Sequence, residues 1–179
     1  MLQIRELRSW ARTLGPEEFR HQVGPFVLIQ RPPQPLLEQA ALQVEASHTR
    51  GMAKRGQLVE EILTMIQGFD NLAVAGLPPL GEEAEIRVGR LPDSDLMVDE
   101  PSVSKEHAVV RWDAAQGGCS VQDLGSKNGT FINAQELPPQ QETLLVDGDV
   151  VGFGDEQFMY FVTEGFYAKL AGAGFARGG

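Results

Sequence analysis

Residues 104–130 read SKEHAVVRWDAAQGGCSVQDLGSKNGT, and they alternate short β-prone segments with clusters of polar, turn-forming residues. The β-prone segments are Ala108–Trp112 and Ser120–Asp123, which have the length of strands in a small sandwich. Gly117 and Gly118 lie between them, where a chain reversal needs residues that tolerate turn conformations. This stretch predicts two strands of an antiparallel sheet.

The same pattern continues on both sides of this stretch. From Gly68 onward the chain consists of short β-prone segments separated by Gly, Asp, Asn and Pro, a spacing typical of an antiparallel sandwich. We therefore predict a mainly β fold. The candidate strands are Leu72–Ala75, Glu85–Gly89, Leu96–Val98, Ala108–Trp112, Ser120–Asp123, Thr130–Ile132, Thr143–Leu145, Val150–Phe153 and Phe158–Val162.

Three polar loop motifs occur in a fixed order within this β region. The motifs are Gly89-Arg90, Ser104–His107 and Ser126–Thr130, followed by Asp147-Gly148-Asp149 and Gly152-Phe153-Gly154. Together these motifs and the two later Gly-containing turns closely resemble the forkhead-associated (FHA) domain family, and the resemblance covers about residues 69–163. It implies an FHA-type β sandwich of antiparallel-rich sheets that binds phosphothreonine.

The resemblance also implies a role for each motif residue. Arg90 and Ser104 would grip the phosphate with Lys105 and Lys127 beside them, and Asn128 would hold the ligand backbone. Members of the family prefer phosphothreonine to phosphoserine because the extra methyl fits a small pocket near the asparagine. Since a methyl is worth only about 0.8 kcal/mol by transfer, most of that preference must come from geometry. Structural support would come from Gly89, His107, Gly129 and Thr130.

The residues themselves indicate a similar class of ligand. The segment from Leu72 to Val162 has only five Lys or Arg residues, and three of them lie in strand-connecting loops beside Ser or Asn. A phosphorylated side chain brings roughly −1.5 to −2 charges and three acceptor oxygens. Convergent loops that supply cations, a hydroxyl and an amide would satisfy such a group. The loop cations are Arg90, Lys105 and Lys127.

Charge and composition exclude several other classes of function. Residues 1–55 contain eight basic and five acidic residues, a net charge of +3, whereas residues 56–179 contain seven and twenty, a net charge of −13. Nucleic acid is therefore not expected as a partner, because phosphate-backbone binding needs a basic stripe. We expect no membrane span and a cytoplasmic location, since the apolar runs are too short and the N-terminus lacks a secretory pattern. The single cysteine, Cys119, predicts neither a disulfide nor a zinc site, and we expect no cofactor or metal.

Outside the β region the pattern becomes helical. We divide the chain into a helical N-terminal extension at 1–68, the FHA domain at 69–163, and a short helix to Leu170 with a flexible Gly-rich tail at 164–179. Apolar residues at three- and four-residue steps predict the first helix, and Pro16 starts the second. The β-prone run Phe26–Gln30 is an alternative to Leu72–Ala75 as the first strand. The expected helices of the extension are Leu2–Leu14, Pro16–Arg20, Leu36–Ala46 and Gln57–Ile66, with a loop at Ser47–Gly56.

These patterns favour an adaptor that binds a Thr-phosphorylated protein in kinase signalling and performs no catalysis. His107 has no second His beside it, and the sequence contains no nucleophile elbow or phosphate-binding Gly-Lys loop. Two alternatives involve the extension. The Leu2–Leu14 helix could pack on the sandwich, or it could bind a second protein as a phosphorylation-independent scaffold. A phosphorylated Thr13 or Thr49 could instead occupy the chain's own pocket and switch the domain off.

Overall fold

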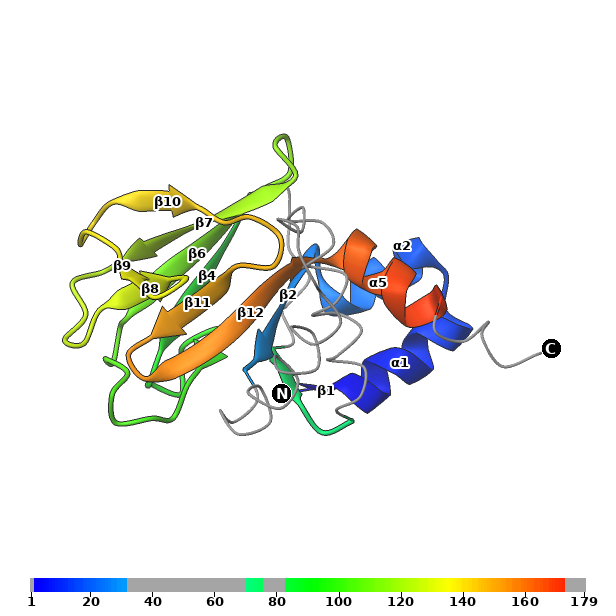
Figure 1. Cartoon of the computed structure of the whole chain (residues 1–179), viewed down its shortest axis with the longest axis horizontal. Helices are drawn as coiled ribbons and strands as arrows, with labels where there is room; N and C mark the ends of the chain where they lie inside the picture. The colour runs from blue at the N-terminus through cyan, green and yellow to red at the C-terminus, as the bar shows by residue number, and fades with distance from the viewer. Residues whose placement is uncertain (1, 32–69, 76–82, 173–179) are drawn as a thin grey trace, which may run out of the picture.

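A computed structural model describes residues 2–31, 70–75 and 83–172, and it confirms the mainly β fold. Two sheets face each other, and three helices lie at the right-hand end of the molecule in Figure 1. One sheet has seven strands in the order β1-β3-β2-β12-β11-β8-β9. The other has five strands in the order β10-β7-β6-β4-β5.

All strand pairs are antiparallel except the parallel pair of β4 with β5. Nine of the twelve strands in the described ranges overlap the nine candidates derived from the sequence, and β2 is the β-prone run of the extension. The strands are β1 Leu2–Gln3, β2 Phe26–Gln30, β3 Ala73–Ala75, β4 Glu83–Gly89, β5 Leu96–Met97, β6 Ala108–Asp113, β7 Gly118–Asp123, β8 Thr130–Ile132, β9 Gln135–Glu136, β10 Glu142–Leu144, β11 Val150–Phe153 and β12 Glu156–Val162.

The main core lies between the two sheets, where alternate residues of facing strands meet. In β12, Phe158 and Tyr160 point into this core, whereas Met159 and Phe161 belong to a second cluster on the other side of the same sheet. The run FVLIQ of β2 is almost continuously apolar for the same reason, because both of its faces are buried. The part of the larger sheet around β2 and β12 is therefore covered on both sides.

Three helices cover the second face of the larger sheet. They are α1 Ile4–Thr13, α2 Pro16–Val23 and α5 Thr163–Gly172. Pro16 occupies the first turn of α2, as expected, and Gly24 ends that helix with a positive φ of 94°. Each helix contributes buried apolar side chains to one cluster with the sheet. Those side chains are Ile4, Leu7, Ala11, Phe19, Val23, Phe166 and Leu170.

The extension thus supplies strands as well as helices. β2 lies between β3 and β12, so Phe26–Gln30 and Leu72–Ala75 are partners in one sheet and not alternatives. The apolar face of the first helix is buried inside the protein, and a second protein would have to use the other face of α1. The division of the chain at residues 68 and 163 and the second partner stay predictions. The helices expected at Leu36–Ala46 and Gln57–Ile66, the loop at Ser47–Gly56 and most of the Gly-rich tail lie outside the described residues.

Candidate functional site

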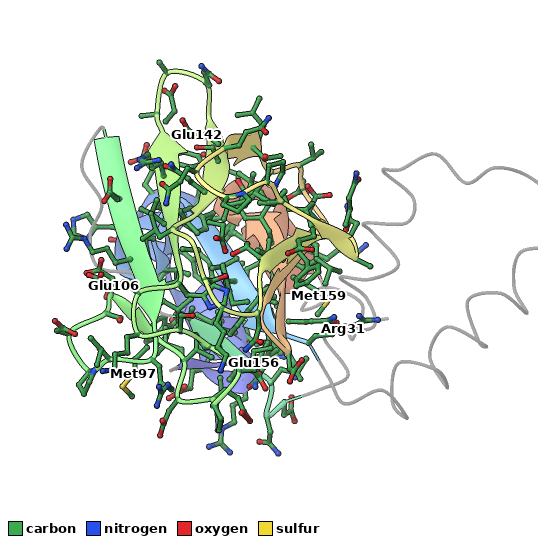
Figure 2. All side chains as sticks on the ribbon, turned by 90° about the vertical axis from the view of Figure 1, so that its left-hand side faces the viewer. Arg31, Met97, Glu106, Glu142, Glu156 and Met159 are labelled. Atoms are coloured by element: carbon green, nitrogen blue, oxygen red, sulfur yellow. The ribbon has the colours of Figure 1, made fainter. Side chains whose placement is uncertain are left out.

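The three motif loops meet at the end of the sandwich away from the helices, on the left in Figure 1. Arg90 follows β4, Ser104 precedes β6, and the loop with Lys127 joins β7 to β8. The Arg90 amide donates to the Ser104 carbonyl at 3.0 Å, and the Lys127 amide donates to Ser104 Oγ at 2.9 Å. Ser104 therefore connects the other two loops, and Figure 2 looks onto this end of the molecule.

Asn128 is held by the loop between β5 and β6. Its Nδ2 donates to the Ser102 carbonyl at 2.7 Å, and Ser102 Oγ in turn accepts from the Asp155 amide at 3.0 Å. Asn128 itself is exposed, and this single bond uses its amide nitrogen. Within the described residues its side-chain oxygen accepts no hydrogen bond. The turn between β11 and β12, which carries Asp155, thus also supports the loop cluster.

His107 joins two of the loops from inside the protein, where it is fully buried. Its Nδ1 accepts from the Ser104 amide at 3.0 Å, so the proton sits on Nε2, which donates to the Gly129 carbonyl at 3.0 Å. Burial lowers the pKa of His107 and outweighs the opposite effects of that carbonyl and of the nearby Asp123. The neutral ring thus bridges the Ser104 loop and the Gly129 loop from inside the protein.

Two glycines of the motifs are required by close packing or backbone conformation. A Cβ atom on Gly89 would lie 2.1 Å from the carbonyl oxygen of Lys105, so only glycine lets these loops approach. Gly129 has a φ of 84°, a conformation that other residues rarely adopt. Gly129 therefore fixes the direction of the chain directly after Asn128.

Asp123 organises the loop between β7 and β8, although the sequence pattern marked it only as the end of a strand. It is 2% exposed and accepts hydrogen bonds from Gly125 N at 2.8 Å, from Ser126 N and Oγ at 2.9 and 2.5 Å, and from Thr130 Oγ1 at 2.7 Å. Burial alone would raise the pKa of Asp123, but these donors hold the pKa below its usual value. An Asp at a strand end followed by Gly and Ser is a turn pattern that could have identified it.

The site contains three exposed cations that are not neutralised internally. Among the described residues Arg90, Lys105 and Lys127 form no ion pair, and the one side-chain hydrogen bond of Arg90 runs from Nε to the Val103 carbonyl at 3.2 Å. The terminal guanidinium nitrogens remain available. Because Ser104 Oγ already accepts from Lys127 N, its own proton is also free to be donated outward. Such a group of donors suits a doubly charged anion with several acceptor oxygens.

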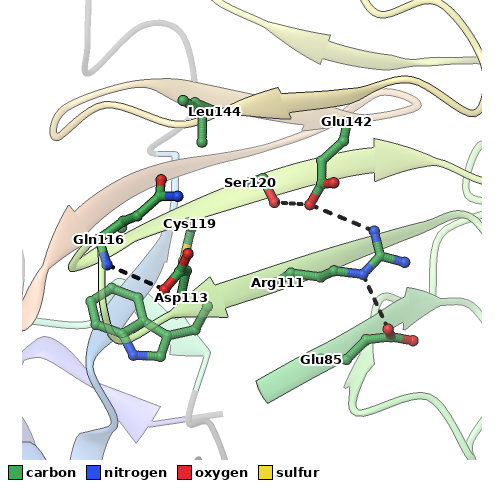
Figure 3. A pocket seen from close by; sticks show the side chains of 10 residues that line it. Glu85, Arg111, Asp113, Gln116, Cys119, Ser120, Glu142 and Leu144 are labelled. Carbon is green, nitrogen blue, oxygen red and sulfur yellow. Dashed lines mark hydrogen bonds and ion pairs between the residues drawn. The ribbon is translucent and has the colours of Figure 1, made fainter. Parts of the chain in front are cut away.

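Away from the loop cluster, a depression of about 700 Å³ lies on the face of the five-stranded sheet (Figure 3). Its central cation, Arg111, contacts Glu85 at 3.2 Å, Glu142 at 3.8 Å and Gln122 at 2.7 Å. This guanidinium is already engaged by two carboxylates, so it is not available to an anion as the loop cations are. The depression therefore differs from the loop cluster in that its cation is already paired with carboxylates.

The described part of the chain contains no group of three or more His, Cys, Asp or Glu residues that could hold a metal ion. No described helix combines the length and hydropathy needed to cross a membrane. Thr13 lies on α1, at the opposite end of the molecule from β8 and the loop that precedes it (Figure 1), and Thr49 lies outside the described residues.

Comparison with known proteins identifies the sandwich. The family model of the FHA domain matches residues 86–154, which run from β4 to the turn after β11. The matched range contains all nine residues to which the motifs gave a binding or supporting role. The strands β1, β2, β3 and β12 and the three helices lie outside it.

Curated relatives and a solved structure each match about half of the chain. The glycogen accumulation regulator GarA of Mycolicibacterium smegmatis is 35% identical over 86 residues, 48% of this chain and 51% of GarA. The oxoglutarate dehydrogenase inhibitor of Corynebacterium jeikeium is 34% identical over 48% of this chain and 56% of its own length. This chain therefore spans about half the length of these two relatives. A structure of Mycobacterium tuberculosis EmbR with a low-affinity phosphopeptide is 29% identical over 50% of this chain and 22% of EmbR, with a TM-score of 0.43.

Proposed function

Because this chain carries a domain of the FHA family, we propose that it binds a partner protein at a phosphorylated threonine and acts as an adaptor in kinase signalling. The observation that carries this proposal is the junction of the three motif loops through Ser104. A kinase would create the binding site on the partner, and a phosphatase would remove it. The two curated relatives are named as a regulator and an inhibitor, which supports a role in regulation by binding.

The phosphate would be held by the cationic part of the loop cluster. Arg90 can donate its terminal guanidinium nitrogens, Ser104 its hydroxyl proton, and Lys105 and Lys127 their ammonium groups. Hydrogen bonds to a charged group are each worth about 1.5–3 kcal/mol, so two or three of them are enough for specific binding. The rest of the domain is acidic, and this group of cations is where it can attract a dianion.

The ligand backbone would be held by Asn128. The bond from its Nδ2 to the Ser102 carbonyl fixes the orientation of the amide plane, so its oxygen is positioned before a ligand arrives. Pre-organisation of this kind lowers the entropy cost of binding. Since the asparagine side chain is fixed relative to Ser104, the distance between phosphate and peptide backbone is fixed as well. A threonine preference would follow from that geometry together with a methyl contact.

We further propose that the protein performs no catalysis. His107 is buried and its two ring nitrogens are both used in structural hydrogen bonds, so the ring cannot serve as a general base for a ligand in the loop cluster. Ser104, three residues earlier, meets Nδ1 through its backbone amide and not through its hydroxyl. Binding and release would therefore be the whole activity.

The test is a library of phosphothreonine peptides measured by fluorescence anisotropy. We expect wild-type protein to bind a subset of them, the unphosphorylated peptides to fail, and phosphoserine versions to bind at least about fourfold more weakly, the loss of one methyl contact. Arg90→Ala should abolish binding. Arg12→Ala removes the same charge from an exposed position on α1 and should have no effect. Unchanged affinity of Arg90→Ala, in a protein that still unfolds cooperatively, would remove the proposed site.

A further inference from the structure

A carboxylate lies directly beside the proposed peptide-binding residue. Glu136 belongs to β9, which pairs with β8 and so lies next to the loop that carries Asn128. A Cβ atom on Gly129 would lie 2.8 Å from Glu136 Oε1 and 3.3 Å from Glu136 Cδ. The carboxylate therefore covers the backbone of the residue that follows Asn128.

This carboxylate has no internal partner within the described residues. It takes part in no hydrogen bond or ion pair there, although three cations lie in the neighbouring loops. The Gly129 amide donates to Ser126 Oγ at 3.0 Å and not to this carboxylate. Glu136 is also exposed, so a ligand can reach it. Its charge is thus not used for the stability of the loop.

A negative charge at this position opposes the phosphate that the site is proposed to bind. Like charges in close proximity lower affinity, whereas a cation brought in by the ligand would offset the repulsion and form a new ion pair. The surroundings act in the same direction, since residues 56–179 carry a net charge of −13. A peptide with a basic residue beside the phosphothreonine meets both requirements, with its phosphate in the cationic loops and its side chain at Glu136.

We infer that Glu136 is a specificity-determining residue, which selects partners that carry Lys or Arg close to the phosphothreonine. The inference rests on the proposed function. It places the discrimination in the β8–β9 hairpin, away from the cations that hold the phosphate. Partners with Asp, Glu or a second phosphate at the same position are rejected by charge repulsion.

The experiment uses the full chain and phosphothreonine peptides with an all-Ala background. Lys, and separately Glu, is placed at each of three positions before and after the phosphothreonine. At one of these positions we expect Lys to tighten binding about three- to fivefold and Glu to weaken it by a similar factor, the size of an exposed ion pair. The Lys effect should shrink as salt is raised. Glu136→Gln should lose the extra Lys-over-Glu preference at that one position and should bind the all-Ala peptide at least as tightly as wild type.

Glu17→Gln is the matched control, since it removes the same charge from an exposed position on α2, at the helical end of the molecule. It should keep the Lys preference of wild type. A preference that survives in Glu136→Gln, or that wild type lacks while it binds phosphothreonine, overturns this inference and leaves the proposed function intact. If wild type binds no phosphothreonine peptide, the proposed function fails and the inference fails with it.

Discussion

Replacement of Asp123 by alanine should destabilise the protein strongly, even though Asp123 has no predicted contact with a ligand. The substitution removes the acceptor of four hydrogen bonds. The Thr130 hydroxyl is fully buried, so the loss of its partner costs about 1–3 kcal/mol. The donors of Gly125 and Ser126 are nearer the surface and can turn to water, at about 0.5–1 kcal/mol each. With one buried bond and three bonds nearer the surface, the free energy of unfolding should therefore fall by about 2.5–6 kcal/mol.

Urea unfolding measures this loss directly, as a lower midpoint at an unchanged m-value. Asp113→Ala is the matched control, because Asp113 also closes a turn, by accepting from Ala115 N at 2.9 Å and Gln116 N at 3.2 Å, but both donors are exposed. It should cost only about 0.5–1 kcal/mol. Asp123→Asn should lie between the two, since its remaining oxygen can still accept from the backbone amides. If Asp123→Ala is no more destabilising than Asp113→Ala, the reasoning about buried donors is wrong.

Three further predictions concern pH, close packing and thiol reactivity. Burial lowers the pKa of His107 below 6.5, so below that pH the unfolded chain binds a proton that the folded protein does not. The stability of the protein should therefore be complete above about pH 6.5 and fall below it. His107→Gln should flatten this fall in thermal stability below pH 6.5. Gly89→Ala forces a Cβ to within 2.1 Å of the Lys105 carbonyl, so it should lower the free energy of unfolding by about 1–3 kcal/mol and weaken phosphopeptide binding. Gly118→Ala, whose Cβ would have nothing within 4 Å, should change neither. Equal effects of the two substitutions would contradict the packing argument. Burial raises the pKa of Cys119 to about 12, so its thiol should react with iodoacetamide at pH 8 only after urea unfolding, and rapid labelling of the native protein would contradict its burial.

The local part of the fold could be predicted from the sequence. β8 and β11 have the predicted bounds, because apolar residues and turn residues alternate clearly around them. The two-residue strands β1 and β9 were missed, since so short a segment carries no period. α2 extends to Val23, three residues beyond the prediction, because Gly24 and not Arg20 ends the helix. The α2 difference arises at the end of an element, where local signals are weakest.

The long-range part could not be predicted in the same way. A strand pattern does not reveal its partner, so the sequence alone leaves Phe26–Gln30 and Leu72–Ala75 as alternatives. In the structure both lie in one sheet, which also depends on β12, far along the chain. The candidate site shows the same limit. The motif residues were placed in the correct loops, but Ser102 was missed, since its bonds reach Asn128 and Asp155, which are 26 and 53 residues away.

The position of β2 in the larger sheet has a consequence for how the protein is made. Gln30 at the end of β2 bonds to Glu156 at the start of β12, 126 residues later. On the ribosome β2 therefore emerges well before its neighbour β12 has been translated, and its apolar side chains stay without their final packing during that interval. Contacts between such distant segments form slowly, so closure of the seven-stranded sheet is the late step of folding. Slow translation or a chaperone should benefit this protein more than a sandwich built from adjacent hairpins.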